Sequence, residues 1–102
     1  MVIISRQVLR AFALRKPDAH SALDEWHQVV TNADWPNGAA VRQSFNSADY
    51  VGNGRFVFNI RGNKYRLVAS VAFSTRTVYI KFIGTHSEYD AIDATTVKFT
   101  RL

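Results

Sequence analysis

A histidine, a glutamate, a tyrosine and an aspartate lie close together in the segment "FIGTHSEYDAID". The ordinary pKa of a histidine is about 6.5, so its imidazole can accept or donate a proton near neutral pH. A single histidine is more often structural, but these neighbours favour a chemical role for His86. We expect Ser87 to cap a short helical turn with Glu88, Tyr89 and Asp90, which would hold His86 at a strand end. Glu88 could orient His86, although an exposed carboxylate in water is the simpler interpretation.

Basic residues are concentrated in one stretch, 51–87, which contains no Asp or Glu. The basic residues in it are Arg55, Arg61, Lys64, Arg66, Arg76 and Lys81. The whole chain has a net charge of +5 and a pI near 10.0, so the rest of it is close to neutral. This distribution predicts a polyanionic partner, although a basic surface that only aids solubility is an equal alternative.

The sequence "NIRGNKYRLV" is typical of two strands joined at Gly62-Asn63. A two-residue turn would pair Arg61 with Lys64, and like charges directly across a sheet are destabilising. A phosphate between the two cations would remove that cost, whereas the alternative is that both side chains extend into water.

The same register pairs Asn59 with Arg66, in the middle of a strand. No acidic residue is near Arg66 in the sequence, although Asp34, Asp49 or Glu88 could reach it after folding. Arg66 is therefore a stronger candidate than the hairpin tip for binding a phosphate.

Alternating apolar residues predict antiparallel strands over 55–60, 64–73 and 77–84, while 46–54 has the composition of turns. With "STRT" as the second loop, Phe73 would pair with Val78 and Arg66 with Thr85. Polar and basic side chains would then converge on a concave sheet face that no helix covers. These side chains are Asn59, Arg61, Lys64, Arg66, Ser70, Tyr79 and Lys81.

The first half of the chain predicts a short strand followed by helices. "VIIS" is a strand, and Ser5 is a suitable N-cap for a helix over 6–16. Pro17-Asp18 would end this helix and cap a second over 19–33, and Pro36 suits the first turn of a third. The expected fold class is α+β, with a helical hairpin packed on one face of an antiparallel sheet.

Composition limits the class of protein. A length of 102 residues with 47% hydrophobic residues fits one domain, 1–102, and no apolar run is long enough to cross a membrane. The start of the chain does not have the pattern of a secretory signal, so we expect a soluble cytoplasmic protein. The absence of cysteine and the scattered positions of three histidines predict no disulfide, no metal site and no cofactor.

The patterns "GNKYRLVASVAF" and "VYIKFIGTHSEYD", with the amphipathic helices before them, resemble the HigB toxin family of RelE-like mRNA interferases. The resemblance covers nearly the whole chain. It implies a RelE/ParE-like fold, cleavage of mRNA on the translating ribosome without a metal, and a toxin–antitoxin hetero-oligomer with a helix-turn-helix antitoxin. Arg66 matches the sheet arginine of the family, Lys64 and Lys81 match basic positions, and His86 and Tyr89 match its T-H-x-E-Y-D segment.

The resemblance leads to a hypothesis for catalysis by Arg66, Lys64, His86 and Tyr89. Arg66 would bind the scissile phosphate while the ribose 2′-hydroxyl attacks it, and Lys64 would add electrostatic support. His86 would transfer protons, and Tyr89 would carry a second proton or stack on a base. The remaining positions of the polar face would contact RNA, namely Arg61, Asn59, Lys81, Tyr79 and Ser70.

Two other functions remain open at this stage. One is a ParE-like toxin that poisons DNA gyrase without nuclease chemistry, which the "THSEY" cluster disfavours. The other is a non-catalytic RNA-binding module whose basic face contacts phosphates and whose tyrosines stack on bases. The fold alone does not separate these possibilities, because related folds support different activities.

Overall fold

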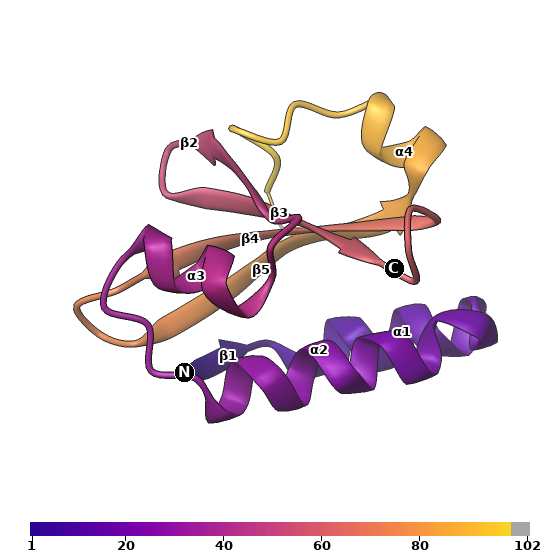
Figure 1. Ribbon diagram of the computed structural model, residues 1–102. Coiled ribbons are helices and arrows are strands. Elements are labelled where there is room, and N and C mark those ends of the chain that lie inside the picture. The colour runs from indigo at the N-terminus through magenta and orange to yellow at the C-terminus, as the bar shows by residue number, and fades with distance from the viewer. Residues whose placement is uncertain (99–102) are drawn as a thin grey trace.

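The computed structural model describes residues 1–98 and is an α+β fold with a five-stranded sheet (Figure 1). The strands are β1 (Val2–Ile4), β2 (Asp49–Gly52), β3 (Arg55–Ile60), β4 (Tyr65–Ala72) and β5 (Thr77–Thr85). The helices are α1 (Arg6–Arg15), a 3₁₀ turn η1 (Pro17–Ala19), α2 (His20–Asn32), α3 (Gly38–Ser44) and α4 (His86–Asp90). The strand order is β1-β5-β4-β3-β2, in which β1 is parallel to β5 and the other pairs are antiparallel.

The helices α1 and α2 lie together along one face of the sheet (Figure 1). Both helices bury an apolar stripe at spacings of three and four residues, which is the pattern of a helix covered on one side. Their buried side chains include Val8, Leu9, Phe12, Leu23, Trp26 and Val30. They pack against alternate residues of the central strands, which is the core that the sequence predicts.

The helix ends agree only in part with the sequence prediction. Ser5 caps α1 by accepting a hydrogen bond from the Gln7 amide, as expected. Asp18 does not cap α2, because its carboxylate is bound by side chains of the sheet. Pro36 precedes α3 rather than lying in its first turn, and Asn37 is the N-cap, accepting from the Ala40 amide at 3.1 Å.

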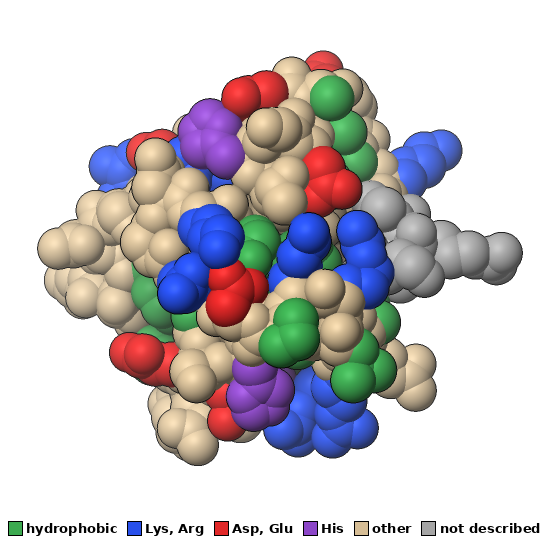
Figure 2. Space-filling view, turned by 90° about the vertical axis from the view of Figure 1, so that its right-hand side faces the viewer, with side chains coloured by type: hydrophobic (Ala, Val, Ile, Leu, Met, Phe, Trp, Pro, Cys, Tyr) green, Lys and Arg blue, Asp and Glu red, His purple; other side chains and the backbone are tan. Residues whose placement is uncertain are grey.

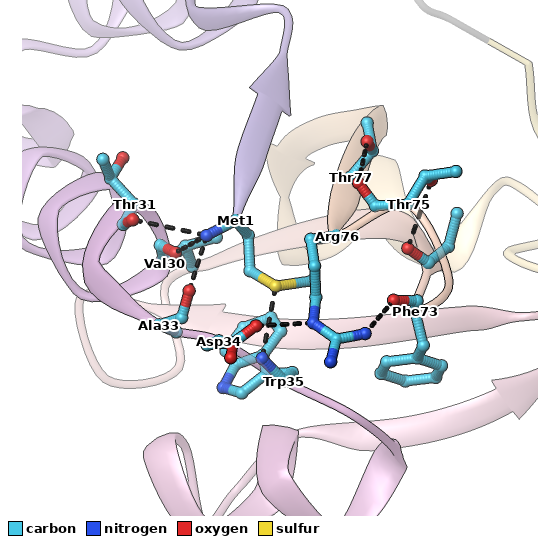
Figure 3. A network of polar contacts seen from close by, with 11 residues as sticks. Met1, Val30, Thr31, Ala33, Asp34, Trp35, Phe73, Thr75, Arg76 and Thr77 are labelled. Atoms are coloured by element: carbon cyan, nitrogen blue, oxygen red, sulfur yellow. Dashed lines mark hydrogen bonds and ion pairs between the residues drawn. The ribbon is translucent and has the colours of Figure 1, made fainter.

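The end of α2 is tied to both β1 and the β4–β5 loop (Figure 3). The amino group of Met1 donates to the carbonyl oxygens of Val30 and Ala33 at 3.2 and 2.6 Å. Arg76 donates from Nε to Asp34 at 2.5 Å, and another of its nitrogens donates to the carbonyl oxygen of Phe73. This network fixes the helical hairpin against one end of the sheet.

The region 46–54, expected to form only turns, contains the edge strand β2. Asp49 pairs with Val57 and Tyr50 with Phe56, after which a bulge shifts the register before Gly52. The composition of this segment is unfavourable for a strand, and it is the long neighbouring strand β3 that supplies its pairing partner.

The β3–β4 hairpin has the predicted register, with Asn59 opposite Arg66 and Val57 opposite Val68. The predicted β4–β5 register is wrong. Val71 pairs with Val78, whereas the predicted register would pair Val71 with Ile80, two residues further along β5. The loop between the strands is therefore 73–76.

A bulge at Lys81 changes the β4–β5 register again. Ala69 pairs with Ile80 and Val68 pairs with Phe82, which leaves Lys81 as the extra residue. Beyond the bulge the alternation is inverted, so Ile83 enters the core beneath the helices. Phe82 lies on the opposite face, whereas the regular alternation predicted over 77–84 would place it on the same face as Val78 and Ile80, so this part of the prediction is wrong.

The sequence indicated that the sheet face away from the helices is uncovered. In the structure, part of this face is covered. The chain returns over it after α4, and Ala94 packs there with Val57, Val68 and Phe82 in a second buried cluster. Arg55 lies beneath this segment and donates to the carbonyl oxygens of Ala94 and Val97. No helix of the described part is long and apolar enough to span a membrane.

Candidate active site

Arg66 lies near one end of the outer sheet face, between Asn59 on β3 and Gly84 on β5. Its guanidinium carbon is 5.9 Å from the centre of the Tyr89 ring, and the Tyr89 ring in turn packs on Phe82. A weak hydrogen bond of 3.4 Å joins Arg66 to the Asn63 carbonyl oxygen. Within residues 1–98 no carboxylate pairs with Arg66, so its charge is available to an external anion.

His86 is placed beside Arg66 by the end of β5. Its backbone amide donates to the Lys64 carbonyl oxygen at 3.3 Å, which continues the β4–β5 pairing by one residue into α4. The Nδ1 atom of His86 is 3.0 Å from an oxygen of Asp90, one helical turn away, and both side chains are exposed. This contact leaves Nε2 directed to other partners and fixes the ring orientation, as in histidines that transfer protons.

We expected Ser87 to cap the turn that carries His86. In the structure Thr85 caps it instead. Thr85 accepts from the Glu88 amide at 3.1 Å and the Glu88 carboxylate accepts from the Thr85 amide at 2.8 Å, which forms a capping box. The hydrogen bond from the Thr85 amide to the carboxylate is the main cause that lowers the pKa of Glu88. Glu88 therefore stabilises the helix start, and it is Asp90 that contacts His86.

The two cations of the β3–β4 hairpin tip share one carboxylate, that of Asp18 from η1. Asp18 Oδ2 is 2.8 Å from Arg61 and 2.5 Å from Lys64, and Oδ1 accepts from the Tyr65 hydroxyl at 2.5 Å. The hydrogen bonds from Lys64 and Tyr65 lower the pKa of Asp18 to about 2, and Asp18 raises the pKa of Tyr65. Arg61 and Lys64 therefore do not simply extend into water. Asp18 already provides a negative charge between them, so their position opposite each other does not require a phosphate.

Figure 2 shows the end of the molecule where the helical hairpin meets the sheet, with Lys and Arg side chains gathered around an acidic one. In addition to the hairpin tip, Arg15 of α1 approaches Glu88 at 3.9 Å. Because Asp18 neutralises only one of the two hairpin cations, this surface keeps a positive charge next to Arg66. It can attract a polyanion.

Three of the expected RNA-binding residues lie elsewhere on the face. Ser70 pairs with Tyr79, and Lys81 Nζ is 5.6 Å from the centre of the Tyr79 ring. Ser70 is four residues along β4 from Arg66, a separation of roughly 13 Å at the usual rise of a strand. The buried cluster around Val68 lies between them.

The structure thus brings Arg66, Asn59, His86 and Tyr89 together, with Lys64 and Arg61 at the edge. Sequence reasoning missed Asp90 and Asp18. Asp90 could have been found, because residues four apart on a helix share a face. Asp18 had no local signal, since its partners are more than 40 positions away.

A strand, a helical hairpin and an antiparallel sheet with a cationic end are the features of a RelE-like toxin fold. A family model described as the RelE-like toxic component of a toxin-antitoxin system matches residues 19–92. The chain belongs to this family, the HigB toxins.

Individual relatives agree with the family. The chain is 28% identical over 94 residues to the mRNA interferase HigB of Escherichia coli O6:H1, covering 90% of this chain and 91% of that protein. It is 29% identical over 97 residues to the mRNA interferase toxin HigB of Escherichia coli K12 and to the mRNA interferase HigB of Shigella flexneri. In both cases the match covers 92% of each chain.

Proposed function

We propose that this protein is an endoribonuclease that cleaves mRNA and that it is the toxic member of a toxin–antitoxin pair. Membership of the HigB family and its mRNA interferase relatives support this function. The observation that carries it is Arg66, a half-buried residue of the sheet that has no acidic partner within residues 1–98 and contacts the turn that presents the exposed imidazole of His86. A cation and a proton carrier at one end of the sheet provide the two kinds of group that cleavage of a phosphodiester requires.

In the proposed reaction the ribose 2′-oxygen attacks the adjacent phosphorus and loses its proton. The bond from phosphorus to the 5′ oxygen breaks, and the 5′ oxygen takes up a proton. The products are a 2′,3′-cyclic phosphate, or the 3′ phosphate formed from it by water, and a 5′ hydroxyl. Arg66 binds two non-bridging oxygens and stabilises the charge that develops on them. His86, oriented by Asp90, transfers protons, and no metal ion takes part.

The other residues have supporting roles in this proposal. The Tyr89 ring holds the Arg66 guanidinium in place from one side, as the 5.9 Å contact indicates. Lys64 and Arg61 attract a flanking phosphate with the charge that Asp18 leaves in excess. Asn59, opposite Arg66, is placed to contact the nucleotide at the cleavage site. Ser70, Tyr79 and Lys81 contact RNA farther along the strand.

We further propose that cleavage takes place on the translating ribosome. The His86 side chain is 46% exposed at one end of the molecule, so a large ribonucleoprotein surface can approach it. An antitoxin, expected to be a helix-turn-helix protein, keeps the toxin in an inactive hetero-oligomer.

Primer extension on mRNA from cells after brief induction of the protein without antitoxin tests this function. We expect new 5′ ends within translated regions for the native protein and none for Arg66→Ala. Arg10→Ala is the matched control, because Arg10 likewise makes no ion pair within residues 1–98 but is exposed on α1 away from the site. Growth arrest with intact mRNA would contradict the proposal and indicate a gyrase poison.

Experiments with purified protein test the role of the ribosome and the metal-independent reaction separately. Cleavage of a translated mRNA in the presence of ribosomes, but not of naked mRNA, is the expected result. Protein that is treated with a chelator and freed of it before the assay should cleave at the same rate as untreated protein. A lower rate that returns only when the treated protein is reloaded with a divalent cation would contradict the metal-independent reaction. Equal cleavage of naked mRNA would contradict the role of the ribosome.

A further inference from the structure

A second surface lies at the other end of the sheet from His86, between α3, β2 and the β4–β5 loop (Figure 1). It is a hollow of about 580 Å³, within the range of binding pockets in general. Its lining is Gly38, Ala39, Arg42, Tyr50, Gly54, Phe56, Val71 and Phe73. None of these residues takes part in the proposed catalysis.

The walls of this groove are aromatic. Phe56 is at the centre, with the Tyr50 ring centred 5.1 Å away on one side and the Phe73 ring 6.3 Å away on the other. Tyr50 is 53% exposed, which is unusual for a tyrosine that faces the apolar side of a sheet. Phe56 is buried and Phe73 half-buried, so they form the base of the groove, while Tyr50 is the exposed ring. Aromatic side chains contribute strongly to protein–protein interfaces, and an exposed tyrosine above an aromatic base indicates a binding surface.

One side of the groove is the free edge of the sheet. β2 is the last strand in the order β1-β5-β4-β3-β2, so the backbone on its outer side is not paired within residues 1–98. The edge has neither a proline nor a lysine to prevent another strand from pairing with it. Asp49 is its one charge, and alternation places Asp49 with Val57 on the other face while Tyr50 faces the groove. An extended segment of another protein can therefore add to this edge.

The charge at the rim indicates the chemistry of that segment. Arg42 is exposed in the last turn of α3 and makes no ion pair with a residue of 1–98. Among the residues that the structure describes, it is the one charged residue that lines the groove. A carboxylate on the partner would complement Arg42, while the phosphates of RNA would find a single cation in an apolar setting and few other donors.

We propose that this groove anchors the antitoxin, through an extended segment that pairs with β2, places an apolar side chain between Tyr50, Phe56 and Phe73, and brings a carboxylate to Arg42. The inference depends on the proposed function, since it requires that the chain has an antitoxin. Because the groove and His86 lie at opposite ends of the sheet, contact there does not by itself involve the catalytic residues.

Binding of the purified antitoxin encoded with this toxin, measured by titration calorimetry, tests the proposal. Arg42→Glu and Tyr50→Ala should each weaken binding by about tenfold or more, because one reverses the charge and the other removes an anchor wall. Both should cleave mRNA like the native protein in the primer-extension assay. Arg10→Glu is the matched control and should change neither result. A change from Glu or Asp to Lys in the antitoxin segment should restore binding to Arg42→Glu.

Three results would overturn the proposal, and a fourth would contradict only the proposed nuclease. Unchanged antitoxin affinity in both groove variants, with circular dichroism like that of the native protein, would show that the anchor lies elsewhere. Folded groove variants that no longer cleave mRNA would make the groove an RNA surface. Self-association of the native protein that Arg42→Glu abolishes would assign the groove to a second copy. A native protein that binds antitoxin but cleaves no mRNA would contradict the proposed nuclease and leave the groove standing.

Discussion

Asp18 and Lys64 are 46 positions apart in the sequence, yet Lys64 Nζ donates to the Asp18 carboxylate at 2.5 Å. The same carboxylate accepts from the Tyr65 hydroxyl and pairs with Arg61. It therefore joins the α1–α2 connection to the hairpin that carries Arg66. This contact answers why two cations face each other at the hairpin tip, because an internal anion lies between them.

The Asp18 contact predicts a loss of stability in acid. Its pKa is lowered from 3.8 to about 2, so folding favours the ionised form. The stabilisation is complete above about pH 4 and is lost as the pH falls through 3.8 towards 2. Urea midpoints should thus fall over this range in the native protein and fall less in Asp18→Asn, which is already less stable at pH 7. Parallel pH profiles for the two proteins would show that other carboxylates cause the acid effect.

The inverted end of β5 predicts that Gly84 tolerates no side chain. A Cβ at Gly84 would lie 2.6 Å from the ring of Phe82 and 3.1 Å from Glu88 Oε1. Gly84→Ala should lower the free energy of unfolding by about 1–3 kcal/mol, as overpacking of a buried site does. In a Phe82→Leu background the ring is absent and the same change should cost less, which a double-mutant cycle in denaturant measures. An equal cost in both backgrounds would contradict the clash.

The two strand pairs β3–β4 and β4–β5 differ in how well the sequence predicts their register. The β3–β4 register could be predicted because Asn59 and Arg66 flank a short glycine turn and both strands alternate regularly. The β4–β5 register could not, because an alternating pattern contains no sign of the extra residue at Lys81, which exchanges the faces of Phe82 and Ile83.

The candidate active site could likewise be predicted only in part from the sequence. His86, Tyr89 and Arg66 were predicted from residue type and motif, and local pairing does bring them to one end of the sheet. The carboxylates around the site depend on contacts across the fold or on a helix boundary displaced by two residues. Asp18 belongs to the first kind, and Asp90, on a helix that starts at His86, belongs to the second.

Tyr89 is predicted to act through its ring rather than through its hydroxyl. The ring lies between Phe82 and the Arg66 guanidinium, with centres 6.5 and 5.9 Å away, and within residues 1–98 the hydroxyl is in no hydrogen bond. Tyr89→Phe should keep mRNA cleavage within about threefold of the native rate, because the cation–π contact remains. Tyr89→Ala should reduce it by about tenfold or more. If Tyr89→Phe is as inactive as Tyr89→Ala in single-turnover cleavage, the hydroxyl transfers a proton.

The contact between His86 and Asp90 predicts how two variants will differ. His86→Ala removes the proton carrier and should slow cleavage by about 100-fold or more, the usual contribution of general acid–base catalysis. Asp90→Asn keeps the shape of the side chain but replaces the carboxylate that contacts Nδ1 and orients the imidazole. Its cleavage should fall less, about tenfold, because the proton carrier is still present.

RNA affinity separates this role of Asp90 from a purely structural one. Loss of the α4 turn would displace Tyr89 from Arg66 and weaken RNA binding, whereas loss of the contact with His86 slows single-turnover cleavage and leaves RNA binding unchanged. Ser87→Ala is the matched control, because Ser87 is an exposed neighbour on the same turn and forms no side-chain hydrogen bond within the described chain. A weaker RNA affinity of Asp90→Asn would assign Asp90 to the stability of α4 and leave the orientation of His86 to the substrate.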